Sequence, residues 1–140
     1  MSGCIPPKPR RPPEILEHTN SGWTGGARSL QSITTNGYVQ FRVPVTNVGT
    51  FIGINDSGED ASTEPEEIRF AIETAFGRFR CWADGSAVTP WQDFSSHDYF
   101  AISRVNGRVT FSRSKSNAPI YFSYGFDSRC EATPDYWQGE

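Results

Sequence analysis

The chain has 140 residues, a formal net charge of −3, 36% hydrophobic residues and 14% aromatic residues. This length suits one domain with its own core, and the negative balance argues against nucleic acid, which needs a clustered basic surface. No apolar run approaches the ~20 residues of a membrane span. The first residues hold no apolar segment, so we expect neither a membrane partner nor a secretory signal.

Residues 1–21 are expected to form an extended, proline-rich arm. Five of the ten prolines lie within residues 1–13, where they disfavour helix and central strand and favour polyproline II. The same stretch fits a PxxPxR pattern, which SH3 domains bind. We prefer an arm that attaches the domain to a neighbouring subunit, with contacts from Pro6, Pro9, Arg10 and Arg11.

Beyond residue 28, hydrophobic residues recur at every second position. This period predicts strands, and the turn residues between them predict seven or so short strands in an antiparallel sandwich. The segment PEEIRFAIETAF competes as a helix, but its isoleucines and phenylalanine keep a period of two. The side chains expected between the two sheets are Val39, Phe41, Phe70, Ile72, Phe79, Ile102, Phe111, Ile120 and Phe122.

The stretch YFAISRVNGRVTFSR, residues 99–113, predicts a hairpin. Asn106-Gly107 is typical of a type I′ turn, because both central residues need positive φ and these two tolerate it. A two-residue turn there places Ile102 opposite Phe111. The apolar faces of the two strands then coincide.

Two long loops are the places where binding is expected. The loop at residues 84–97 carries Trp91, which can stack on a sugar ring. Oxygen atoms of neighbouring side chains can then orient the hydroxyls of the sugar. The polar partners predicted for that ring are Asp84, Gln92 and Asp93. The alternative is that Trp91 only closes the open end of the sandwich.

The loop at residues 55–67 carries six carboxylates. Asp56, Glu59 and Asp60 are hard oxygen donors suited to calcium, but the EF-hand spacing is absent and charge runs are usually solvated. We therefore expect no cofactor and no metal, with calcium as the alternative. The three cysteines, Cys4, Cys81 and Cys130, are expected to be free thiols without metal-ligand spacing.

Catalysis is not expected from this chain. Glu67 and Glu73 flank one strand, but Arg69 and Ala71 lie between them on that face. A retaining glycosidase needs two carboxyl groups ~5 Å apart. No serine lies in a nucleophile-elbow sequence.

A lectin-like module of bacterial and bacteriophage surface proteins resembles the stretch GWTGGARSLQSITTNGYVQFRV, followed by FIGINDS, IRFAIET, GRFRCWADG, DYFAISRVNGRVTFSR and PIYFS. That module belongs to the concanavalin A-like group, which includes laminin-G-like and SPRY-like domains. The resemblance covers residues 22–124 and implies a two-sheet antiparallel jelly roll. Residues 125–140 are then a C-terminal tail, in which Trp137 is a candidate docking anchor.

A free-standing domain with a short proline arm looks like a bacteriophage tail component. The resemblance thus implies a non-enzymatic virion protein of a tail tip, baseplate or fibre, made in the host cytoplasm and assembled in several copies. Its expected partners are other tail proteins, through the arm, and host surface polysaccharide. The alternative is an intracellular SPRY-like module that binds a peptide.

Overall fold

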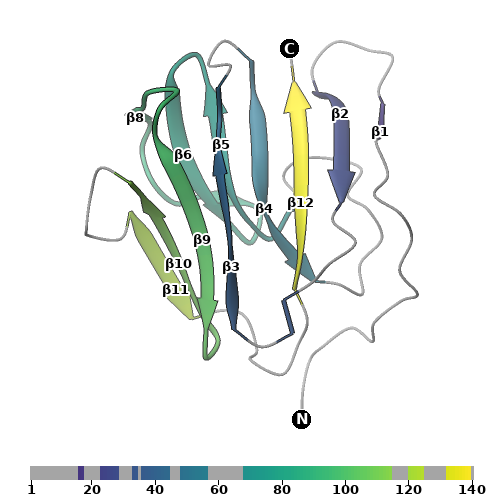
Figure 1. Ribbon diagram of the computed structural model, residues 1–140, viewed down its shortest axis with the longest axis vertical. Coiled ribbons are helices and arrows are strands. Elements are labelled where there is room, and N and C mark those ends of the chain that lie inside the picture. The colour runs from purple at the N-terminus through teal and green to yellow at the C-terminus, as the bar shows by residue number, and fades with distance from the viewer. Residues whose placement is uncertain are drawn as a thin grey trace.

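The computed structural model describes residues 16–17, 23–28, 33–34, 36–44, 48–56, 68–114, 120–124 and 132–139. These residues form two packed antiparallel β-sheets (Figure 1). The predicted all-β sandwich is confirmed. None of the described segments contains a helix that is long and apolar enough to cross a membrane. The expected arm contacts at residues 6–11 lie outside the described residues.

The larger sheet has the strand order β1-β2-β12-β4-β5-β6-β7, and β8 pairs with the same edge of β6 as β7. Its strands are β1 (Leu16–Glu17), β2 (Trp23–Arg28), β4 (Thr50–Asp56), β5 (Phe70–Ala75), β6 (Arg78–Ala83), β7 (Ser86–Ala87), β8 (Gln92–Asp93) and β12 (Ala132–Gly139). The smaller sheet has the order β11-β10-β9-β3. Its strands are β3 (Gly37–Arg42), β9 (Tyr99–Val105), β10 (Arg108–Arg113) and β11 (Tyr121–Tyr124).

The predicted β9–β10 hairpin is confirmed in register and in turn type. Ile102 pairs with Phe111, and Arg104 pairs with Val109. Asn106 and Gly107 have φ angles of 50° and 80°, as a type I′ turn requires. All of Ile102, Val109 and Phe111 are buried, so one apolar face of the hairpin contributes to the core.

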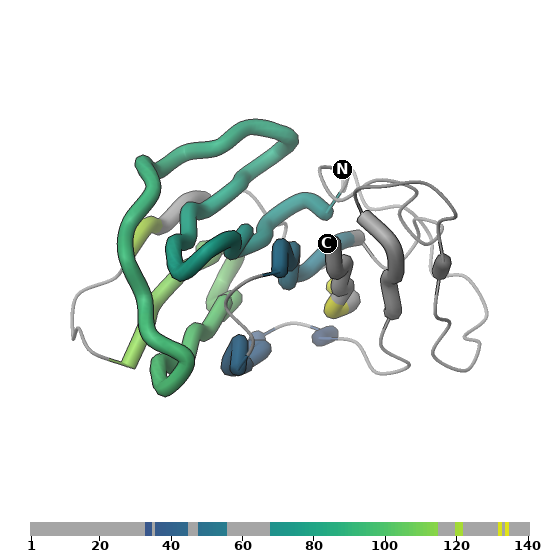
Figure 2. Tube along the Cα trace, turned by 90° about the horizontal axis from the view of Figure 1, so that it is seen from above, coloured from purple at the N-terminus to yellow at the C-terminus, as the bar shows by residue number. Residues whose placement is uncertain are grey.

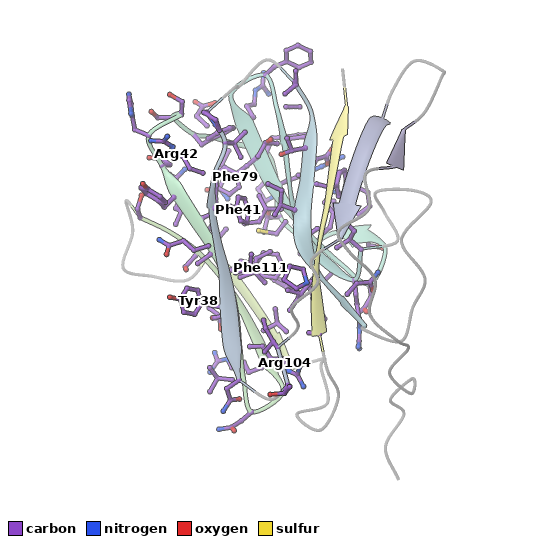
Figure 3. All side chains as sticks on the ribbon, turned by 45° about the vertical axis from the view of Figure 1, so that its right-hand side comes forward. Tyr38, Phe41, Arg42, Phe79, Arg104 and Phe111 are labelled. Carbon is purple, nitrogen blue, oxygen red and sulfur yellow. The ribbon has the colours of Figure 1, made fainter. Side chains whose placement is uncertain are left out.

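The core lies between the sheets, where Phe41, Phe79 and Phe111 meet, whereas Tyr38 and Arg42 project from the outer side of the small sheet (Figure 3). The structure confirms the expected burial of Phe70, Ile72, Phe79, Ile102 and Phe111. Val39, Phe41 and Ile120 are partly buried and pack against this core. The side chain of Phe122 lies outside the described part. Aromatic contacts are frequent, as between Phe79 and Phe100 at 5.0 Å.

The C-terminal segment differs from the sequence-based expectation. Residues 132–139, expected in a tail, form β12 between β2 and β4 in the large sheet. Pro134 disfavours a central strand because proline has no N–H for the ladder. Here the β2 ladder begins only at Asp135, and Ala132 exchanges backbone hydrogen bonds with Ile33. Pro134 therefore occupies a gap between two paired stretches, where no N–H is needed.

The segment that links β7 to β9 carries the chain from the large sheet to the small one, and it runs on the left in Figure 2, where the trace is green. This connection first follows the free edge of β6. Val88 donates its N–H to the carbonyl of Cys81, and Phe94 donates to Gly77. These bonds fix the position of Trp91, which lies between them.

Candidate functional site

The outer face of the large sheet carries a group of polar and aromatic side chains. On β6, Phe79 and Cys81 are fully buried toward the core, so the alternating residues Arg78, Arg80 and Trp82 point outward. On β5, Glu73 shares this outer face and lies directly opposite Arg80.

A network of hydrogen bonds and ring contacts among partly buried side chains organises this face. The carboxylate oxygen Oε1 of Glu73 accepts hydrogen bonds from Nε of Arg80 and from Nε1 of Trp82, both at 2.7 Å. Trp82 also packs on Phe51 with ring centroids 5.3 Å apart. Ala71 lies in the same cluster, and its small side chain leaves room for the two rings to meet. The network therefore fixes the guanidinium of Arg80 in one place.

Trp91 stacks on that fixed guanidinium. The Cζ atom of Arg80 lies 4.4 Å from the ring centroid of Trp91 and 5.2 Å from the ring of Trp82. Both distances lie within the ~6 Å range of a cation–π contact. Trp91 remains 36% exposed and does not belong to the core cluster. Phe94 closes this end of the sandwich instead, in contact with Phe79 and Phe100.

An open pocket of about 170 Å³ lies beside Trp91. Its walls are Ala75, Phe76, Arg78 and Trp91, so two aromatic residues and one arginine border it. The volume is below the ~300 Å³ at which pockets for drug-sized ligands begin. It suits one sugar ring or one amino-acid side chain.

Phe76 is the most exposed large hydrophobic residue among those described, at 77%. It occupies the first central position of the β5–β6 turn with φ of 50°, followed by Gly77 at 76°. The equivalent positions in the two other tight hairpins hold Asp84 and Asn106, which tolerate positive φ. An aromatic residue in this conformation is strained, so backbone preference does not explain its presence.

The residues that the sequence analysis predicted for the site are not all brought together. Trp91 and Asp93 lie on the outer face, since Asp93 pairs with Arg78 in register. Gln92 pairs with the buried Phe79 and is half-buried. Asp84 lies in the β6–β7 turn, four residues beyond Arg80 and so about 13 Å along the strand. Its carboxylate accepts a 2.9 Å hydrogen bond from Nε of Arg69.

Sequence reasoning missed Glu73, Phe76 and Arg78 as site residues. In the sequence, Arg78, Arg80 and Trp82 alternate with Phe79 and Cys81, which indicates that the first three share one face. This alternation did not show that the β8 segment runs along the same edge. The signal that was available for Phe76 is its position before a glycine at a predicted turn, where an aromatic residue is unusual.

The structure does not describe the side chains of several other candidate residues. For Trp137 the structure describes the backbone of β12 only, and the calcium candidates lie in a loop whose side chains are outside the described residues. Within the described residues, no group of three or more His, Cys, Asp or Glu is placed to hold a metal ion. Cys81 is a free, buried thiol. Burial raises its pKa to about 12, although a hydrogen bond with Thr89 acts in the opposite direction.

Solved structures similar to this one are β-sandwiches. The PSpry domain of TRIM65 matches with a TM-score of 0.57 at 15% identity, over 80% of this chain and 63% of that one. The Bacillus licheniformis β-glucanase matches with a TM-score of 0.45 at 12% identity, over 84% and 59%. The chain thus spans less than two thirds of either protein. The TRIM65 match supports a concanavalin A-like fold. Neither protein-family models nor curated proteins match the sequence.

Proposed function

We propose that this protein is a non-enzymatic β-sandwich binding module that contacts host surface glycans as a component of a bacteriophage tail. The observation that carries the binding role is the open pocket between Phe76 and Trp91. Exposed aromatic rings beside charged groups suit sugars, whose C–H faces stack on rings and whose hydroxyls bind polar atoms. The tail assignment rests on the resemblance of residues 22–124 and on the proline-rich arm.

The arrangement of carboxylates supports binding without catalysis. Glu73 and Asp93 both lie on the outer face, but they are two strand spacings apart, with β6 between them, and two residues apart in register. Strand spacing of ~4.8 Å and a rise of ~3.3 Å per residue put their Cα atoms about 12 Å apart. Glu73 is also held by two donors, which suits a structural role.

A second candidate function is a SPRY-like module that binds a peptide. The similarity to the TRIM65 PSpry domain favours it. The same pocket would then hold one side chain of the peptide. Genes for tail proteins beside the coding sequence would favour the tail assignment over this alternative.

The decisive experiment uses particles assembled with a Trp91→Ala variant. One stacked ring contributes about 1 to 3 kcal/mol, by analogy with bases on aromatic side chains, so a single site binds weakly. Several copies on one particle raise the overall affinity. We expect particles carrying Trp91→Ala to lose binding to host polysaccharide while the isolated domain keeps its melting temperature. Tyr38→Ala, an exposed aromatic of the other sheet, is the matched control. Unchanged binding by the Trp91→Ala particles would reject the glycan role.

The role of the arm has its own test. Deleting residues 1–13 should leave the sandwich folded but prevent its incorporation into particles, because Pro6, Pro9, Arg10 and Arg11 are the proposed contacts. Incorporation at normal levels would show that the arm does not attach the domain.

A further inference from the structure

Arg78 differs from the other arginines of the large sheet's outer face. Its side chain is exposed and, among the residues that the structure describes, makes no hydrogen bond or ion pair. The neighbouring guanidinium groups are already engaged. Arg69 binds Asp84, and Arg80 binds Glu73. The cation that lines the pocket is therefore available to a ligand.

We propose that the pocket binds an acidic sugar residue, with its carboxylate on Arg78 and its ring on Trp91. This inference rests on the proposed glycan-binding function and names the class of sugar. A guanidinium presents paired N–H donors that match a carboxylate, whereas a neutral sugar offers it only single hydroxyl contacts. The volume of about 170 Å³ fits one such residue of a longer chain.

Among the described residues of the outer face, Arg78 is the guanidinium available to an anion. Arg80 is paired with Glu73 at 2.7 Å. Arg113 donates a 2.7 Å hydrogen bond to the carbonyl of Asp93, but its guanidinium lies 5.1 Å from the ring of the inward-facing Phe79, on the core side of the sheet. The carboxylate of the ligand is therefore assigned to Arg78 alone. Asp93, opposite Arg78 in register, can accept a hydrogen bond from a sugar hydroxyl.

Phe76 supplies the second wall of the pocket. Its strained φ of 50° and its 77% exposure are both unfavourable for the free protein. A sugar ring bound between Phe76 and Trp91 would cover this apolar surface. It would also explain why an aromatic residue occupies a strained position. Phe76 is therefore proposed as a specificity-determining residue of the same site.

The test compares glucuronate-containing oligosaccharides with the same oligosaccharides after reduction of their carboxyl groups. Binding to the full chain is measured by NMR titration at low and high salt. We expect the acidic form to bind about tenfold more tightly, the size of a hydrogen bond to a charged group, and to weaken as salt rises. Arg78→Gln should remove that preference, and Arg78→Lys should keep part of it. Arg42→Gln, an exposed arginine of the small sheet, is the control.

The outcomes separate this inference from the function on which it rests. Equal binding of both forms, lost in Trp91→Ala but not in Arg78→Gln, would overturn the acidic-sugar inference and leave glycan binding intact. Binding of neither form would overturn both. Binding of an acidic peptide at Arg78, without any oligosaccharide, would also overturn both and favour the peptide module.

Discussion

Glu73 illustrates how one residue organises the outer face of the large sheet without lining the pocket. Its side chain is 13% exposed and accepts from both Arg80 and Trp82. Glu73→Ala would leave both donors without their acceptor, and we expect it to lower the free energy of unfolding by about 1 to 3 kcal/mol. Urea denaturation measures this loss.

The matched control for Glu73 is Asp84→Asn. Its ion pair with Arg69 is solvent-exposed and should contribute less than about 1 kcal/mol. Asn also tolerates the positive φ of that turn. An equal loss in both variants would contradict the organising role of Glu73.

Cys81 makes a pH-dependent contribution to stability. Its pKa is raised from 9.0 to about 12 by burial, so the folded state holds the thiol proton more tightly than the unfolded state. The free energy of unfolding should fall as pH rises from 9 toward 12, by about 1.4 kcal/mol per unit at the steepest. Cys81→Ser lacks this ionisation and should show a shallower decline in the same urea titrations. Parallel declines in both proteins would mean that the thiol titrates normally.

At the scale of single elements, the tight hairpins are the predictable part of the fold. Asn106-Gly107 specifies the β9–β10 turn locally, and the register follows from alternation alone. The pairing of β12 with β2 and β4 depends on residues about 80 to 110 positions away, and no local pattern encodes it. The site divides in the same way. Trp91 could be predicted from its place in the long loop at residues 84–97, whereas its pocket also needs the β5–β6 turn beside β8.

The β5–β6 turn allows a test of strain. Phe76→Asn should stabilise the domain by about 1 kcal/mol, because Asn adopts the left-handed conformation more readily. That gain corresponds to a rise of a few degrees in melting temperature for a domain of this size. Asn106→Phe, which places an aromatic residue at the equivalent position of the β9–β10 turn, should lower the melting temperature by a similar amount. A lower melting temperature for Phe76→Asn would show that Phe76 is a packing residue.

For the whole molecule, the position of β12 makes the C-terminus part of the fold. A chain ending at residue 131 would expose the edges of both β2 and β4 and leave Ile33 without its backbone partner Ala132. We expect this truncation to abolish cooperative thermal unfolding. The chain lacking residues 1–13 should retain it. If the chain ending at residue 131 still unfolded cooperatively, residues 132–139 would be a tail that the fold does not need.

The same strand sets the order in which the protein can assemble during synthesis. The hairpins β5–β6 and β9–β10 join residues that are close in sequence, so they can form as soon as they leave the ribosome. The large sheet cannot join β2 to β4 until Ala132–Gly139 has been translated, because β12 is the strand between them. Two unpaired strand edges therefore persist until β12 has been translated, and during that interval the nascent chain is open to pairing with its neighbours.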